Sequence, residues 1–168
     1  VSMKYFFTRK LMLMKESRGF ISLPGGFGTM DEMFELLTLQ QTGKAEPMPI
    51  VLLDAQGGSF WTGLKTFVDE HLVPAGVISR DDLDRVLITD SVSEAVANIT
   101  GFWRNYDSLR WVGDRLVLRL VHEPTDADID SLNERFGGMC AEGRIERTDP
   151  LDVELADGDA VELPRIVL

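Results

Sequence analysis

A glycine-rich turn between an apolar segment and an acidic helix is the part of this sequence whose residue types could do chemistry. It reads LPGGFGTMDEMFE over residues 23–35. Gly25, Gly26 and Gly28 are expected to let the backbone adopt positive φ and approach a bound group closely. Thr29 can cap the following helix or offer its hydroxyl. The free N–H groups of a helix start favour an anion by about 0.3 to 1 kcal/mol at an exposed site, so a phosphate would fit here.

The turn alone leaves two interpretations open, a nucleotide phosphate site and a plain tight connection between a strand and a helix. Asp31 and Glu32 stand beside it, where a simple phosphate cradle would favour a lysine or no charge. Glu32, which we expect in the first helical turn, could be catalytic or could only complement the helix dipole. Arg9 and Lys10 upstream could likewise be functional or a solvated basic pair.

The spacing of apolar residues predicts alternating helices and strands around this turn. We expect helices at about residues 5–15, 29–41, 59–72 and 91–103, and buried strands at 20–23, 49–53 and 85–89. Gly43 is expected to end the second helix, and Ser91 with Glu94 to form a capping box at the start of the fourth. The third helix should turn four side chains inward: Trp61, Leu64, Phe67 and Val68. Strands that alternate with crossover helices indicate a parallel sheet.

Beyond Tyr106 the pattern changes, with strands expected at 115–121, 144–147 and 165–168 and a helix at 125–140. The predicted fold class is therefore α/β, a Rossmann-like parallel sheet flanked by helices over residues 1–106, with a small α+β extension over residues 107–168. Three strands are few for a doubly wound fold, and Val1 is not an initiator methionine. We therefore expect the first strands of this domain to precede residue 1.

Composition excludes several function classes. The chain has 168 residues, 44% of them hydrophobic, which is enough for a folded domain. Its net charge of −11, of which −7 falls on residues 102–168, argues against general binding to nucleic acids or anionic membranes. One cysteine, Cys140, and no Cys/His cluster predict neither an internal disulfide nor a metal site. No apolar run suits a membrane span or a signal peptide, so we expect a cytoplasmic protein.

Residues 4–42 are similar to the Lonely Guy (LOG) family, whose motif is PGGxGTxxE preceded by an Arg-Lys pair. Six residues match every fixed position of that motif: Pro24, Gly25, Gly26, Gly28, Thr29 and Glu32. Arg9 precedes Glu32 by 23 residues, as the resemblance requires, and the sheet pattern continues in the family's manner through Thr100. The acidic tail resembles extensions of some longer bacterial members, and its role is not implied.

The resemblance implies a phosphoribohydrolase that splits the N-glycosidic bond of a nucleoside 5′-monophosphate, a cytokinin or AMP-like nucleotide, to free base and ribose 5-phosphate. Glu32 would be the catalytic carboxylate that stabilises positive charge on the sugar or orients water. Arg9 would bind substrate acceptors and keep Glu32 ionised, with Lys10 a weaker substrate-binding candidate. The 5′-phosphate would be anchored by Gly25, Gly26, Gly28 and Thr29. No cofactor is implied, and the expected partners are the nucleotide and a second copy in a homodimer or higher oligomer.

Two rival interpretations remain open at this point. One is a module of the same superfamily that binds a nucleotide or molybdenum cofactor without cutting it, and the other is a regulated or docking variant with vestigial catalytic residues. Related proteins are also labelled lysine decarboxylases, but that chemistry needs a pyridoxal phosphate lysine, and no lysine here stands in a setting that suggests a Schiff base. The hydrolase hypothesis depends on Arg9 and Glu32 meeting around one sugar phosphate.

Overall fold

The computed structural model describes residues 5–168, except for the side chains of Phe6 and Arg9, which lie outside the described part. The chain divides into two compact units, Val1–Phe102 and Trp103–Leu168.

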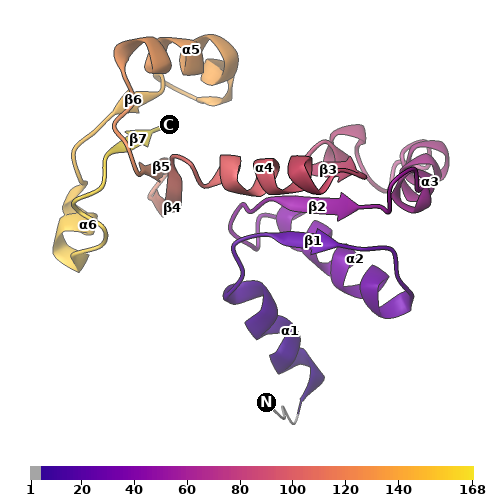
Figure 1. Cartoon of the computed structure of the whole chain (residues 1–168). Coiled ribbons are helices and arrows are strands. Elements are labelled where there is room, and N and C mark those ends of the chain that lie inside the picture. The colour runs from indigo at the N-terminus through magenta and orange to yellow at the C-terminus, as the bar shows by residue number, and fades with distance from the viewer. Residues whose placement is uncertain (1–4) are drawn as a thin grey trace. The chain divides into compact units, whose positions relative to one another are not determined.

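A three-stranded parallel sheet forms the centre of the first unit, as predicted (Figure 1). Its strands lie in the order β1 (Phe20–Ser22), β2 (Ile50–Leu53) and β3 (Val86–Thr89). Ile50 stands opposite Phe20 on one side and Val86 on the other. The first unit therefore has the predicted Rossmann-like α/β arrangement of parallel strands connected through helices.

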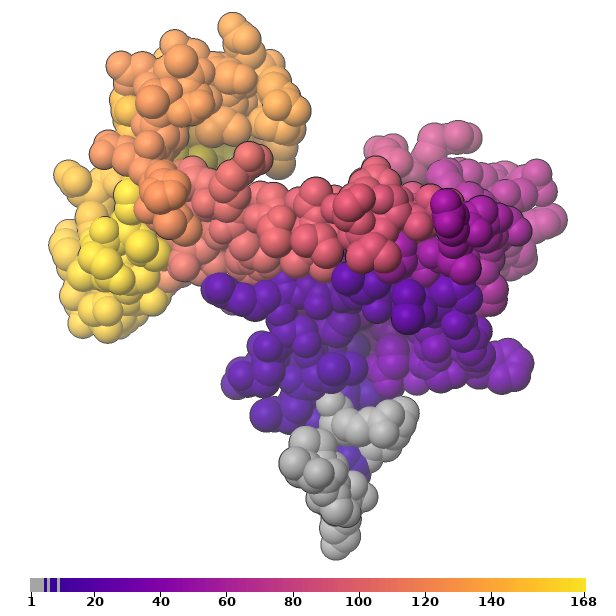
Figure 2. All heavy atoms as spheres, in the orientation of Figure 1, coloured from indigo at the N-terminus to yellow at the C-terminus, as the bar shows by residue number. Residues whose placement is uncertain are grey.

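Four α-helices surround this sheet: α1 (Phe6–Lys15), α2 (Phe27–Gln41), α3 (Phe60–Phe67) and α4 (Val92–Phe102). A π-helical turn, Val68–Leu72, continues α3, and a 3-10 turn, Arg80–Leu83, precedes β3. In the space-filling view, the indigo residues of α1 lie at the surface of the unit (Figure 2). The sequence predicted each of the four α-helices described in the first unit, although α2 begins two residues earlier than expected.

The central strand β2 is buried on both faces. Ile50 and Leu52 belong to a cluster with Met33 of α2, whereas Val51 and Leu53 belong to a second cluster on the opposite face. Trp61 of α3 joins the first cluster and Ala95 of α4 the second, and neither is exposed to solvent. Because successive strand side chains point to opposite faces, helices on both sides require the continuous apolar run that the sequence shows.

The predicted end of α2 is confirmed in detail. Gly43 follows the last helical residues with a φ of 65°. Its N–H donates to the carbonyl of Gln40 at 3.2 Å, and the N–H of Lys44 donates to the carbonyl of Leu39 at 2.9 Å. This arrangement satisfies helix carbonyls that would otherwise lack donors, and it needs a left-handed residue, for which glycine has no Cβ penalty.

The capping box predicted for α4 is only half formed. The hydroxyl of Ser91 accepts the N–H of Glu94 at 3.3 Å, as expected. The Glu94 carboxylate, however, accepts a hydrogen bond from the Thr89 hydroxyl, and the same hydroxyl accepts the N–H of Ser91. Thr89 therefore takes the place that the carboxylate was expected to fill.

Two burial predictions for the first unit are wrong. Strand β1 is not buried, since Ile21 is 45% exposed. Ile21 stands opposite Val51 at the sheet edge, beyond the residues that pack with α4. Phe67 was expected to face inward but is 49% exposed, at the residue before the π turn begins, whereas Trp61 and Val68 are buried as predicted.

A four-stranded antiparallel sheet forms the second unit, which has the predicted α+β character. Its order is β4 (Tyr106–Val112), β5 (Arg115–Leu120), β7 (Arg165–Val167) and β6 (Glu146–Arg147). It also has two α-helices, α5 (Asp126–Phe136) and α6 (Asp152–Asp157), and a 3-10 turn, Gly137–Met139. One face packs its apolar residues against Ile129 of α5. The sequence analysis missed β4 and α6, and it extended α5 through the 3-10 turn.

A buried cluster of charges, rather than apolar side chains, holds α6 to the sheet. Glu154 Oε1 lies 2.8 Å from a guanidinium nitrogen of Arg119 and 2.8 Å from one of Arg165, and none of the three side chains is more than 6% exposed. Burial alone would raise the pKa of Glu154, but hydrogen bonds from Arg119, the Leu151 N–H and Arg165 outweigh it and lower the pKa below its ordinary value. Asp159 adds a second carboxylate, 2.7 Å from Arg119.

Replacing Glu154 with alanine should strongly destabilise the second unit. The substitution leaves two buried guanidinium groups without their shared carboxylate, and breaking a buried ion pair in this way costs about 3–5 kcal/mol. Urea unfolding should show this loss for Glu154→Ala. Asp157→Ala is the matched control, because it removes a carboxylate from the same helix that is 53% exposed and pairs with Arg110. Equal losses for the two variants would contradict a special role for the buried cluster.

The stability of the second unit should also depend on pH through Asp159. Hydrogen bonds from Arg119 and Arg110 lower the pKa of Asp159 in the folded state. Its contribution is therefore complete at neutral pH and is lost as the pH falls below about 4, through the ordinary range of an aspartate towards the lower folded value. In thermal unfolding between about pH 6 and pH 3, Asp159→Asn should lose less stability on acidification than wild type. Asp114→Asn, in the exposed turn between β4 and β5, should follow wild type.

Candidate functional site

Lys10, one of the predicted site residues, lies among three carboxylates of α2 in the first unit. The ammonium of Lys10, on α1, lies 2.7 Å from Asp31 Oδ2, 2.5 Å from Glu35 Oε2 and 3.9 Å from Glu32 Oε2. The Lys10 side chain is 12% exposed. Asp31 and Glu35 are four residues apart and share one face of α2. We call these four side chains, Lys10, Asp31, Glu32 and Glu35, the lysine–carboxylate cluster.

The carboxylates around Lys10 determine what this lysine can do. Hydrogen bonds to Asp31 and then to Glu35 raise the pKa of Lys10 well above its ordinary value. The amine therefore stays protonated at neutral pH, whereas a Schiff-base lysine must lose its proton to act as a nucleophile. One ammonium and three carboxylates give the cluster a formal charge of −2, which favours a developing positive charge nearby.

Glu32 is placed differently from its predicted position. Because α2 begins at Phe27, Glu32 is its sixth residue and not part of its first turn, which contains no acidic residue. The alternative that Glu32 only complements the helix dipole is therefore weaker than the sequence suggested. The side chain is 25% exposed, but its Oε2 atom is buried and accepts no hydrogen bond within the described part of the chain. A buried carboxylate oxygen without a donor is uncommon and requires an explanation.

The glycine turn also differs from its predicted conformation. None of its three glycines has a positive φ. Gly26 caps α2 in an extended conformation with a φ of −87° and a ψ of −161°, and no side chain caps this helix. Thr29 therefore lies inside the first turn and is not the N-cap, which corrects that prediction as well. The reason for glycine here is the missing side chain and not the backbone angle.

A Cβ atom would affect the three glycines differently. At Gly25 it would stand 2.9 Å from the Cβ of Thr29 and closer still to the Thr29 hydroxyl. At Gly26 and Gly28 it would meet nothing within 4 Å. Gly25 is thus required by packing within the turn, whereas Gly26 and Gly28 face open space at the start of α2.

Arg9 belongs to α1, next to Lys10. Its side chain lies outside the described residues, so the expected meeting of Arg9 with Glu32 stays a prediction. The sequence analysis did not identify Glu35 as a site residue. The signal for it was present in its spacing, since it follows Asp31 by four residues and a lysine stands on the preceding helix.

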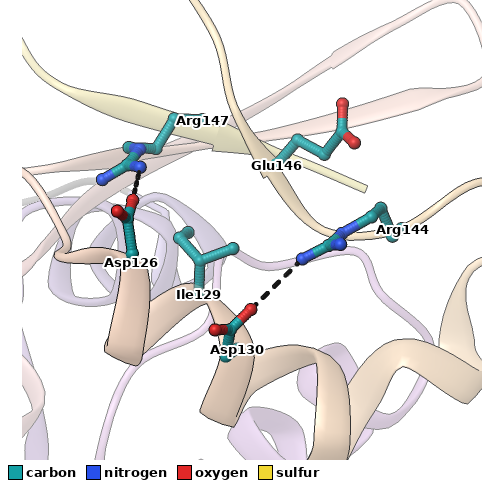
Figure 3. Close-up of a pocket in the computed structure, with 6 residues that line it drawn as sticks. All are labelled: Asp126, Ile129, Asp130, Arg144, Glu146 and Arg147. Carbon is teal, nitrogen blue, oxygen red and sulfur yellow. Dashed lines mark hydrogen bonds and ion pairs between the residues drawn. The ribbon is translucent and has the colours of Figure 1, made fainter.

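A hollow of about 480 Å³ in the second unit is a different kind of site. Figure 3 shows its lining, in which every residue but Ile129 is charged: Asp126, Ile129, Asp130, Arg144, Glu146 and Arg147. Arg147 pairs with Asp126, and Arg144 lies 3.5 Å from Asp130. Each guanidinium thus has a carboxylate partner, and the lining has more acidic than basic side chains. Nothing in this hollow favours a phosphate.

Residues 5–168 contain neither a metal-ligand cluster nor a helix suited to span a membrane. In this part of the chain, no three or more histidine, cysteine, aspartate or glutamate side chains are placed together to hold a metal ion. No helix within the same residues combines the length and the apolar character that crossing a bilayer requires.

Comparison with known proteins places the first unit in a family. The family model described as "Possible lysine decarboxylase" matches residues 1–99. A cytokinin riboside 5′-monophosphate phosphoribohydrolase of Mycobacterium marinum is 33% identical over 88 residues, which are 52% of this chain and 45% of that protein. The enzyme of the same name from Mycobacterium tuberculosis is 34% identical over 88 residues, with the same two shares. The Arabidopsis thaliana protein named LOG1 is 33% identical over 94 residues, 56% of this chain and 42% of that protein.

The chain thus spans less than half the length of these relatives. The family match nevertheless takes in more than half of the chain, including α1, the glycine turn and the lysine–carboxylate cluster. The chain therefore belongs to the family described as possible lysine decarboxylases, which is the LOG family.

Proposed function

We propose that this protein hydrolyses the N-glycosidic bond of a nucleoside 5′-monophosphate, a cytokinin riboside monophosphate or an AMP-like nucleotide, to free base and ribose 5-phosphate. The observation that carries this proposal is the position of Glu32, whose buried oxygen has no described donor and which lies on the same helix as the uncapped start of α2. The relatives from Mycobacterium marinum and Arabidopsis thaliana are named as enzymes of this kind, which supports it.

Glu32 suits the sugar end of this reaction. Cleavage of a ribosyl bond passes through a state with positive charge at the anomeric carbon, which a nearby carboxylate stabilises. The formal charge of −2 on the lysine–carboxylate cluster acts in the same direction. A carboxylate oxygen without a donor also has lone pairs free to orient the attacking water.

The start of α2 suits the phosphate end. The first helical hydrogen bond runs from the Met30 N–H to the Gly26 carbonyl at 3.1 Å, so the N–H groups of Phe27, Gly28 and Thr29 have no acceptor within the helix. These groups and the helix dipole attract an anion. With a rise of 1.5 Å per residue, Phe27 and Glu32 are separated by about 7–8 Å along the axis. The proposed phosphate site and the carboxylate thus lie on one helix, between one and two turns apart.

Arg9 completes the proposed catalytic pair, since a guanidinium on α1 beside Lys10 would bind the substrate's phosphate or hydroxyl groups. We propose Gly25, Gly26, Gly28 and Thr29 as the phosphate anchor. Lys10 remains the weaker substrate-binding candidate, because three carboxylates already surround it.

We also propose that the protein acts as a cytoplasmic homodimer or higher oligomer. On α1, several large apolar side chains are 42–68% exposed: Phe7, Leu11, Met12 and Leu13. A helix that is apolar on most of its circumference is typical of a buried position, and a second copy would cover it. The non-catalytic alternative, a nucleotide or molybdenum-cofactor carrier, gives no reason for a buried Glu32 oxygen that accepts no hydrogen bond from the described residues.

The first prediction of this proposal concerns the reaction and Glu32. The complete protein should release free base from a nucleoside 5′-monophosphate but not from the nucleoside, as measured by chromatography. Glu32→Gln should lower kcat by about 10²-fold or more, because the amide cannot stabilise positive charge, while nucleotide binding persists. Glu46→Gln, at an exposed position, is the matched control and should act as wild type. Unchanged turnover in Glu32→Gln would refute its role, and bound, intact nucleotide without free base would favour the carrier.

The second prediction separates the glycines of the turn. Gly25→Ala should lower both the melting temperature and the affinity for AMP, because its Cβ collides with Thr29. Gly26→Ala should leave the melting temperature unchanged, since its Cβ enters open space, but weaken AMP binding on the order of tenfold where that space holds the phosphate. Thermal unfolding and calorimetric titration measure the two effects. Wild-type affinity in Gly26→Ala would place the phosphate elsewhere.

A further inference from the structure

Glu35 is the carboxylate nearest to Lys10. Its Oε2 atom lies 2.5 Å from the ammonium, compared with 2.7 Å for Asp31 and 3.9 Å for Glu32. Its side chain is 37% exposed, whereas that of Lys10 is 12% exposed. Asp31 and Glu35, one helical turn apart, therefore hold the ammonium from two points on α2.

The longer distance to Glu32 has a chemical consequence. At 3.9 Å, the ammonium and Glu32 Oε2 attract each other through their charges but are too far apart for a hydrogen bond. The oxygen thus stays available to a sugar or a water. Lysine carries its charge on a flexible four-carbon stem, so an ammonium released by its nearer partners could move 1 Å and bind this oxygen directly.

We propose that Glu35 is a positioning residue for hydrolysis: with Asp31, it holds the Lys10 ammonium close to Glu32 but outside hydrogen-bond distance, so that the Glu32 carboxylate remains free for the substrate. This inference rests on the proposed function. Glu35 acts through Lys10 and touches neither the sugar nor the base.

A purely structural role for Glu35 would have a different signature. If Glu35 only fastened α1 to α2, its loss would lower the melting temperature, and apparent kcat would fall only in proportion to the fraction of folded protein. A positioning role predicts a loss in kcat with little change in KM even where the variant is fully folded, because the phosphate anchor at the start of α2 is untouched.

The kinetic test compares wild type, Glu35→Gln and the control Glu46→Gln in the complete protein, with AMP and isopentenyladenosine monophosphate as substrates. Glutamine keeps the shape of Glu35 but loses its charge. We expect kcat to fall about tenfold in Glu35→Gln, with KM within about twofold of wild type, as for a displaced catalytic group. Glu46→Gln should retain wild-type values. An unchanged kcat in Glu35→Gln, or a fall explained by lost melting temperature, would overturn the positioning role.

A crystal structure of Glu35→Gln provides a second test that does not depend on turnover. We expect Lys10 Nζ to move to hydrogen-bond distance of Glu32 Oε2, about 2.8 Å. A Lys10 ammonium that stays 3.9 Å from Glu32, or turns away from it, would overturn the inference. Absence of base release from wild type would overturn the proposed function itself, and with it the role in hydrolysis. Release by wild type with unchanged kcat in Glu35→Gln would overturn the positioning role alone.

Discussion

The ionic contact between Lys10 and α2 is the interaction on which the candidate site depends. Of the described residues of α1, only Met14 belongs to the buried core, so apolar packing alone fixes this helix weakly. The ammonium of Lys10 meets carboxylates at Asp31 and Glu35, which sets the rotation of α1 as well as its position along α2. Because Arg9 is the next residue on the same helix, any role for Arg9 depends on the same contact.

Helix α2 has two opposite electrostatic environments at two points along its length, as the proposed sugar phosphate substrate would require. Its first turn has unpaired N–H groups and no acidic side chain, which suits an anion. One turn later, the carboxylates of Asp31, Glu32 and Glu35 outnumber the lysine. The core behind the helix is built from Met33 and Leu36 against β2, so the two regions are held at a fixed separation by one rigid element.

The sequence predicted the first unit well because its strands and helices follow the burial pattern that periodicity reports. The prediction failed where buried residues are charged and exposed residues are apolar. In α6, Glu154 is fully buried while Val153 and Leu155 are 47% and 55% exposed, the reverse of an ordinary amphipathic helix. In β4, Arg110 donates hydrogen bonds to Asp157 and Asp159 and does not pack in an apolar core. The alternation of polar and apolar residues that predicts a strand is therefore missing from this part of the sequence. The angles of the glycine turn were missed because a sequence does not distinguish a glycine needed for positive φ from one needed, as at Gly25, because a Cβ would collide with Thr29.

Charge compensation explains why the site itself was only partly predictable. A linear motif identifies Lys10 and Glu32 as candidates, but it does not say which charges neutralise each other once the helices pack. In the second unit, Arg119 and Arg165 share the buried Glu154, and Asp159 adds a further carboxylate to Arg119, so the cations are paired and the cluster has the form of a structural element. In the lysine–carboxylate cluster, by contrast, the described carboxylates exceed the ammonium, and one buried oxygen accepts no hydrogen bond from the described residues. A buried oxygen without a donor weakens a fold unless something else binds it. Under the proposed function, the positive charge that develops on the sugar during cleavage would be stabilised there.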